Sequence, residues 1–109
     1  MFIITKTNRL IITRGDTATM QIALETQDGK IVPLEIGDQL TLSVKKTAKD
    51  VSPLIQLTAD ETGQFCISPD DTDNLACGVY LYDIQLTREG NIYTVIPTNY
   101  IEIKEEITR

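Results

Sequence analysis

Residues 67–86 decide the fold, and they read ISPDDTDNLACGVYLYDIQL. Their second half alternates: every second residue from Tyr80 to Leu86 is aromatic or aliphatic, whereas Asp83 and Gln85 fall between. Because successive side chains of a strand point to opposite faces, this alternation predicts a long strand with one buried face.

The first half of this stretch predicts one short helical turn near residues 69–75. Ser68 is suited to the N-cap, and Pro69 to the first helical position. Asp70 and Asp71 place negative charge beside the free N–H groups of the first turn.

Between the helical turn and the strand, Gly78 gives the chain the freedom to change direction. The Gly-x-Tyr pattern that it begins predicts a tyrosine corner, in which the hydroxyl of Tyr80 bonds to backbone a few residues upstream. We expect Tyr80 and Tyr82 to be buried together. Tyr82 also stands where an antibody-type second cysteine would be, so that disulfide is excluded.

The rest of the chain contains further short segments that are typical of strands, with turn signals about every ten residues. These segments are residues 2–6, 9–13, 17–25, 31–32, 39–46, 53–58, 64–67, 92–96 and 100–107. Gln27–Lys30 and Arg88–Asn91 are expected to form hairpin turns, and Pro97 indicates a bulge or a strand that changes sheets. We predict an all-β, immunoglobulin-like two-layer sandwich of seven to nine strands, with residues 1–109 as a single domain.

Composition narrows the possible partners. The net charge of −6 argues against nucleic acid or an anionic membrane as the main partner, because both require clustered Lys and Arg. No apolar run is long enough to span a bilayer, and the apolar residues at the N-terminus precede the charges, the wrong order for a signal peptide. We expect synthesis in the cytoplasm without secretion by a signal peptide.

Cys66 and Cys77 allow two interpretations: a disulfide around the helical turn, or two free thiols. The apparent lack of a secretion signal favours free thiols. A zinc site is poorly supported, because the chain has no histidine and only these two cysteines.

The sequence offers little for catalysis. Without histidine, the commonest general base and the Ser–His and Cys–His pairs are missing. Asp70, Asp71 and Asp73 could serve a hydrolase as paired carboxylates or, with Asp60, bind calcium, but helix capping is favoured. We expect no enzyme activity, no catalytic residue, no cofactor and no metal.

Two shorter patterns have simpler explanations. Arg14-Gly15-Asp16 spells the integrin tripeptide, but three residues recur by chance, and a turn between strands is favoured. Lys45, Lys46 and Lys49 form a small basic cluster without aromatic neighbours for stacking bases, which favours a solvated loop over a phosphate or nucleic-acid site.

The chain resembles the N-terminal domain of phage baseplate upper proteins over nearly its whole length. The matching features are Arg14-Gly15-Asp16-Thr17, Asp28-Gly29, Leu42 to Lys46, Pro69-x-x-Thr72-x-x-Leu75-x-x-Gly78-x-Tyr80-x-Tyr82-Asp83-Ile84-x-Leu86, and Gly90 before Tyr93-Thr94-Val95. The resemblance implies a non-enzymatic module of a phage or prophage tail baseplate, located in the virion. Its expected partners are other tail or baseplate proteins, including further copies of itself. It implies no catalytic residues and fits either a stand-alone protein or an excised domain.

Val79 and Leu81 lie opposite the face of Tyr80 and Tyr82, so the long strand begins apolar on both sides. Such a strand needs a cover, either Phe2–Lys6 or the C-terminal strand, or else a partner protein. Val79 and Leu81 are therefore the candidate interface. The alternative function is a small-ligand or carbohydrate-binding sandwich, which the lack of tryptophan disfavours.

Overall fold

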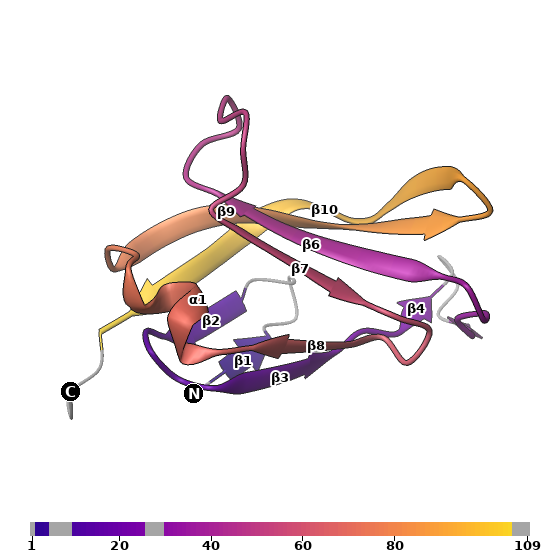
Figure 1. Ribbon diagram of the computed structural model, residues 1–109, viewed down its shortest axis with the longest axis horizontal. Helices are drawn as coiled ribbons and strands as arrows, with labels where there is room; N and C mark the ends of the chain where they lie inside the picture. The colour runs from indigo at the N-terminus through magenta and orange to yellow at the C-terminus, as the bar shows by residue number, and fades with distance from the viewer. Residues whose placement is uncertain (1, 5–9, 26–29, 106–109) are drawn as a thin grey trace.

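A computed structural model describes residues 2–4, 10–25 and 30–105. The strands form two layers, and the helix lies at the end of the molecule where β9 begins (Figure 1). The predicted all-β sandwich with one short helical turn is confirmed. The elements are β1 (Phe2–Ile4), β2 (Leu10–Thr13), β3 (Ala18–Gln21), β4 (Leu24–Glu25), β5 (Ile31–Val32), β6 (Gln39–Lys45), β7 (Ile55–Ala59), β8 (Gln64–Ile67), α1 (Pro69–Asp73), β9 (Gly78–Arg88) and β10 (Asn91–Lys104).

The larger layer is a six-stranded sheet in the order β1-β2-β10-β9-β6-β7. Its strands pair antiparallel except for β2 and β10, which are parallel, with Leu10 beside Ile101 and Ile12 beside Ile103. β9 lies between β10 and β6 and is hydrogen-bonded on both edges. The long strand predicted from the sequence is therefore the centre of this sheet.

The second layer is smaller and contains β3 paired with β8, and β4 paired with β5. The sequence predicted one strand over residues 17–25, but the structure divides it. The N–H of Ile22 donates to the carbonyl of Gly63 at 2.8 Å, and the chain then leaves β8 to pair with β5. The predicted turn at 27–30 lies largely outside the described residues.

The core fills the space between the layers, as the alternation predicted. In the six-stranded sheet the buried side chains of β6 and β9 are Leu40, Leu42, Val44, Tyr80, Tyr82, Ile84 and Leu86. The second layer contributes Met20, Phe65 and Ile67. Removing each such side chain from water stabilises the fold by roughly 1.5–3 kcal/mol, so this packing is the main source of stability.

The structure describes ten strands rather than seven to nine. The predicted segment 17–25 divides into β3 and β4, whereas the predicted segments 92–96 and 100–107 join as β10. β10 runs through Pro97 without a break. Its register against β9 shifts between Thr94 and Ile96 and again between Ile96 and Asn99. Of the two explanations offered for Pro97, a bulge is the one observed.

Helix α1 begins as the sequence predicted, with Ser68 as N-cap and Pro69 in the first turn. The carboxylate of Asp71 accepts hydrogen bonds from the N–H of Ser68 at 2.8 Å and from its hydroxyl at 3.2 Å. Thr72 is fully buried, and its hydroxyl oxygen accepts a hydrogen bond from the N–H of Gly15 at 2.8 Å. This contact attaches the helix to the turn between β2 and β3.

That turn contains the integrin-like tripeptide. The N–H of Asp16 donates to the carbonyl of Thr13 at 3.2 Å, and Gly15 has a φ of 79°. Arg14 donates from Nη1 to the carbonyl of Leu75 at 3.4 Å. The prediction of a turn at this position is confirmed, and its contacts are to the chain itself.

Candidate functional site

The start of β9 is held by a glycine and a tyrosine. Gly78 has a φ of 147°, which residues with side chains rarely adopt. The hydroxyl of Tyr80 donates to the carbonyl of Ala76 at 2.6 Å, which is the bond expected in a tyrosine corner. These two residues therefore fix the direction in which β9 leaves the α1 region.

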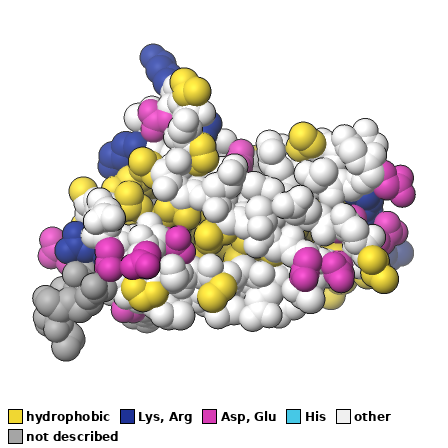
Figure 2. Space-filling model, viewed as in Figure 1, with side chains coloured by type: hydrophobic (Ala, Val, Ile, Leu, Met, Phe, Trp, Pro, Cys, Tyr) yellow, Lys and Arg dark blue, Asp and Glu magenta, His cyan; other side chains and the backbone are white. Residues whose placement is uncertain are grey.

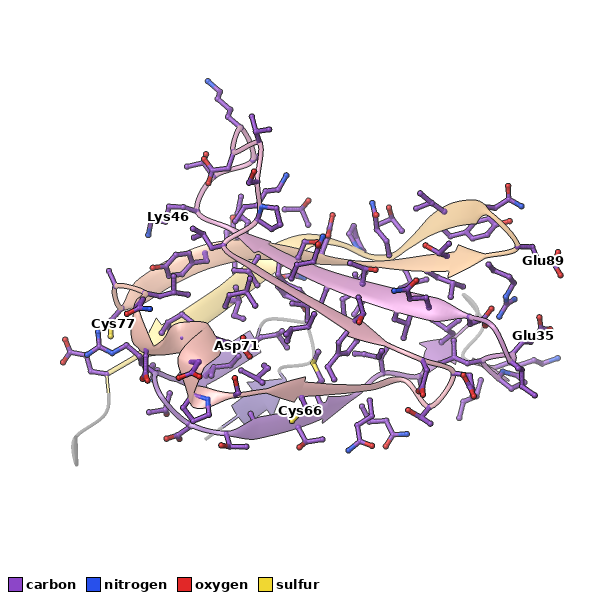
Figure 3. The ribbon with its side chains drawn as sticks, in the orientation of Figure 1. Glu35, Lys46, Cys66, Asp71, Cys77 and Glu89 are labelled. Carbon is purple, nitrogen blue, oxygen red and sulfur yellow. The ribbon has the colours of Figure 1, made fainter. Side chains whose placement is uncertain are left out.

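Lys46 adds a third contact at the same place. Its ammonium lies 4.4 Å from the centroid of the Tyr80 ring and donates to the carbonyl of Val79 at 3.3 Å. Lys46 contacts β9 in this way (Figure 3) while it stays exposed in the loop after β6, as Lys49 does, so the predicted solvated loop agrees with the structure for both lysines. Sequence reasoning missed this contact because it joins residues far apart in the chain.

Val79 and Leu81 point away from the core, on the outer face of the six-stranded sheet. Val79 is 42% exposed and Leu81 is half-buried. The register places Tyr100 directly beside Leu81, and Tyr100 is 54% exposed. We name Val79, Leu81 and Tyr100 the outer-face patch. Tyr100 was not among the predicted interface residues, because its position beside Leu81 depends on the bulges in β10.

The two covers predicted for Val79 and Leu81 do not lie over them. The C-terminal strand β10 pairs beside β9 in the same sheet, with Glu102 opposite Val79. β1 belongs to that sheet too, separated from β9 by β2 and β10. Of the N-terminal segment, residues 5 and 6 lie outside the described residues. Neither strand forms a layer over the patch.

A hollow of about 180 Å³ adjoins the patch. Leu81, Ala48 and Thr98 line it together with Lys45 and Asp83. Ala48 belongs to the loop between β6 and β7, which projects from the sheet in Figure 1. Figure 2 shows hydrophobic side chains gathered near the base of this projection, over the start of β9. Apolar area with one ammonium and one carboxylate beside it is suited to contact with another protein.

Among the acidic residues of α1, Asp71 caps the helix. Asp71 accepts the two capping bonds from Ser68, and Asp70 is exposed. Among the residues that the structure describes, no group of three or more His, Cys, Asp or Glu side chains is arranged to hold a metal ion.

Both thiols are free, as predicted. Cys66 is an exposed residue of β8, and Cys77 lies in the turn that precedes β9 (Figure 3).

The four tyrosines divide into two pairs. Tyr80 and Tyr82 are buried, and burial raises the pKa of Tyr82 to about 12. Tyr93 lies opposite Leu86, on the face that the core occupies, whereas Tyr100 lies opposite Leu81 on the outer face. Cross-strand partners share a face, so the two exposed tyrosines do not form one platform for stacking a sugar.

An ion pair at the other end of β9 was not foreseen. Arg88 donates from Nε and Nη2 to the two carboxylate oxygens of Asp38 at 2.8 and 2.6 Å. The N–H of Glu35 donates to the same carboxylate at 2.8 Å. The Arg88 bond, helped by the Glu35 N–H, lowers the pKa of Asp38 to about 2. The sequence placed Arg88 only in a hairpin turn, and no local pattern reveals its distant partner.

No protein-family model matches the chain, and no curated protein has a significantly similar sequence. In the part of the chain that the structure describes, no helix is long and apolar enough to cross a membrane. A functional interpretation must therefore come from the surface itself and from the sequence resemblance.

Proposed function

We propose that this chain is a non-enzymatic assembly module of a phage or prophage tail baseplate, which docks onto other virion proteins through the outer-face patch. The observation that carries the proposal is an exposed apolar area on a central strand of the sheet: Val79, Leu81 and Tyr100 lie together on the outer face. The resemblance to baseplate upper proteins supplies the biological setting and the expected location in the virion.

The composition of the patch supports docking. The cores of protein interfaces are enriched in aromatic residues and depleted of charge, and their rims are polar. Here a tyrosine and two aliphatic residues lie at the centre, and Lys45 and Glu102 are their cross-strand neighbours. The surrounding charges would give orientation and specificity, and the apolar centre most of the affinity.

The test is incorporation into phage particles. Particles induced from a bacterium that carries the gene are purified, the chain is quantified by mass spectrometry, and immunogold electron microscopy locates it. We expect the chain at the tail tip. Leu81→Lys places a charge at the centre of the contact and should lower incorporation at least about tenfold.

Val51→Lys is the matched control, because Val51 is 96% exposed on the projecting loop. Both variants should first give cooperative thermal unfolding like that of the natural chain, so that a folding defect is not mistaken for lost docking. Absence of the chain from purified particles would refute the proposal, as would normal incorporation of Leu81→Lys.

A further inference from the structure

The first part of β10 forms an open sheet edge. Over Asn91–Ile96 the strand pairs with β9 on one side. Its other neighbour, β2, pairs with β10 only from Ile101 to Lys104. Among the described residues, no strand pairs with the outer edge of Asn91–Ile96. The segment lies at the end of the molecule opposite α1 (Figure 1), so this edge is separate from the outer-face patch.

This edge carries no charge. The ten residues from Asn91 to Tyr100 contain no Asp, Glu, Lys or Arg, although 24% of the chain is charged. Natural edge strands are commonly protected from pairing by charged residues, especially lysine. Here the protecting features are Pro97 and the bulges, and they begin only after Thr94. The start of β10 is therefore free to accept another strand.

The turn geometry fixes which backbone groups face outward. Arg88 and Asn91 flank a two-residue turn in which Glu89 has a φ of 52° and Gly90 of 81°. Residues that flank such a turn exchange hydrogen bonds, and the pattern then alternates along the strand. The N–H and C=O groups of Tyr93 consequently point to β9, and those of Ile92 and Thr94 point away from it.

We propose that a second copy of this chain pairs with this edge, antiparallel and about a two-fold axis at Tyr93. Ile92 of one copy then exchanges hydrogen bonds with Thr94 of the other. The two Tyr93 rings become neighbours at the axis, and the two six-stranded sheets become continuous. Tyr93 is 51% exposed and Ile92 66% exposed, so both side chains are available to pack in such a contact.

The uncharged edge is a place where two copies of this acidic chain can meet without repulsion between charged side chains. Each copy carries a net charge of −6, so most surfaces of two copies repel each other. In the proposed register the acidic residue at the hairpin tip, Glu89, approaches the Pro97 region of the other copy, which is uncharged. The contact is self-complementary, as a two-fold interface requires.

Sedimentation velocity of the purified chain over a range of concentrations tests the proposal. The natural chain should convert from its 12.2 kDa monomer to a dimer as concentration rises. The double variant Ile92→Lys with Thr94→Lys sets lysine opposite lysine at both paired positions and should weaken the dimer at least about tenfold. The double variant Ile36→Lys with Val51→Lys makes the same charge change at exposed sites and should dimerise like the natural chain.

A charge exchange tests the register. Ile92→Glu with Thr94→Glu should also be monomeric, but mixing it with the lysine variant should restore a heterodimer, because each lysine then faces a glutamate. Hydrogen exchange should slow at the amides of Ile92 and Thr94 when the dimer forms. The Tyr93 amide, already bonded to β9, should change little.

Three results would overturn the proposal. The first is a natural chain that stays monomeric up to about 1 mM. This result includes the case in which hydrogen exchange at the Ile92 and Thr94 amides slows only when a different protein is added. The second is a dimer that survives the lysine variant. The third is a dimer broken by Leu81→Lys instead, which would move self-association to the outer-face patch. Because these experiments use the purified chain alone, their failure is separate from failure of the incorporation test.

Discussion

Tyr80 is the residue on which the start of β9 depends most. Its ring is buried in the core, its hydroxyl bonds to the carbonyl of Ala76, and the ammonium of Lys46 lies over its face. One side chain thus connects the core, the turn after α1 and the base of the projecting loop. The exposed Val79 is held between these contacts, so Tyr80 acts as a positioning residue for the outer-face patch.

Replacing Tyr80 with phenylalanine should lower the free energy of unfolding by about 1 kcal/mol. The ring keeps its packing, and only the hydrogen bond to Ala76 is lost. Urea unfolding followed by circular dichroism measures the change, and the dependence on urea concentration should stay the same. Tyr93→Phe is the control and should stay within about 0.5 kcal/mol of the natural chain, because Tyr93 is half-exposed. Equal losses in the two variants would contradict the role given to the Tyr80 hydroxyl.

At the scale of elements, α1 is too short to be stable by itself. It keeps its place through its capping residues and through Thr72, which contacts the turn between β2 and β3. The hydroxyl oxygen of Thr72 accepts a hydrogen bond from the N–H of Gly15, which lies in the turn and takes no part in strand pairing. The helix therefore fixes where β3 begins.

Thr72→Val should destabilise the protein by about 1–3 kcal/mol, because the isosteric side chain leaves the Gly15 N–H without its acceptor. Thr72→Ser keeps the oxygen and should cost about 1 kcal/mol for the lost methyl group. Chemical unfolding compares the two variants. Hydrogen exchange gives an independent measure: the Gly15 amide should exchange faster in the valine variant only. Unchanged exchange there would show that this bond does not hold the turn.

The elements that could be predicted from the sequence are those whose evidence is local. The alternation in β6 and β9, the capping residues of α1 and the hairpin at Arg88–Asn91 each depend on neighbours in the chain. The contacts of Asp38 with Arg88 and of Lys46 with Tyr80 could not be predicted, because their partners are distant in sequence. Tyr100 was missed as part of the candidate site for a related reason: the bulges around Pro97 determine the register that brings it beside Leu81.

At the scale of the whole molecule, the ion pair of Asp38 and Arg88 joins two parts of the fold. Asp38 precedes β6, and Arg88 ends β9. The pKa of Asp38 is lowered to about 2 from its ordinary 3.8. A carboxyl group with a lower pKa in the folded state stabilises the fold above its unfolded pKa, and this contribution is lost as pH falls toward the folded pKa.

Asp38→Asn should therefore lower the melting temperature at about pH 6. The difference in melting temperature between the variant and the natural chain should become smaller as pH falls from about 4 to 2, because Asp38 of the natural chain is then protonated as well. Thermal unfolding at several pH values measures it. Glu61→Gln removes one exposed carboxylate and serves as the control for net charge; it should melt close to the natural chain throughout. A difference for Asp38→Asn that does not change with pH would mean that lost packing, not lost charge, causes the effect.

The parallel ladder between β2 and β10 has a consequence for biosynthesis. Leu10 leaves the ribosome long before its neighbour Ile101. Non-local pairing of this kind closes late and makes folding slow. During translation, the edge of β2 that later pairs with β10 must stay unpaired until β10 has emerged, and a chaperone that shields this edge in that interval would raise the yield.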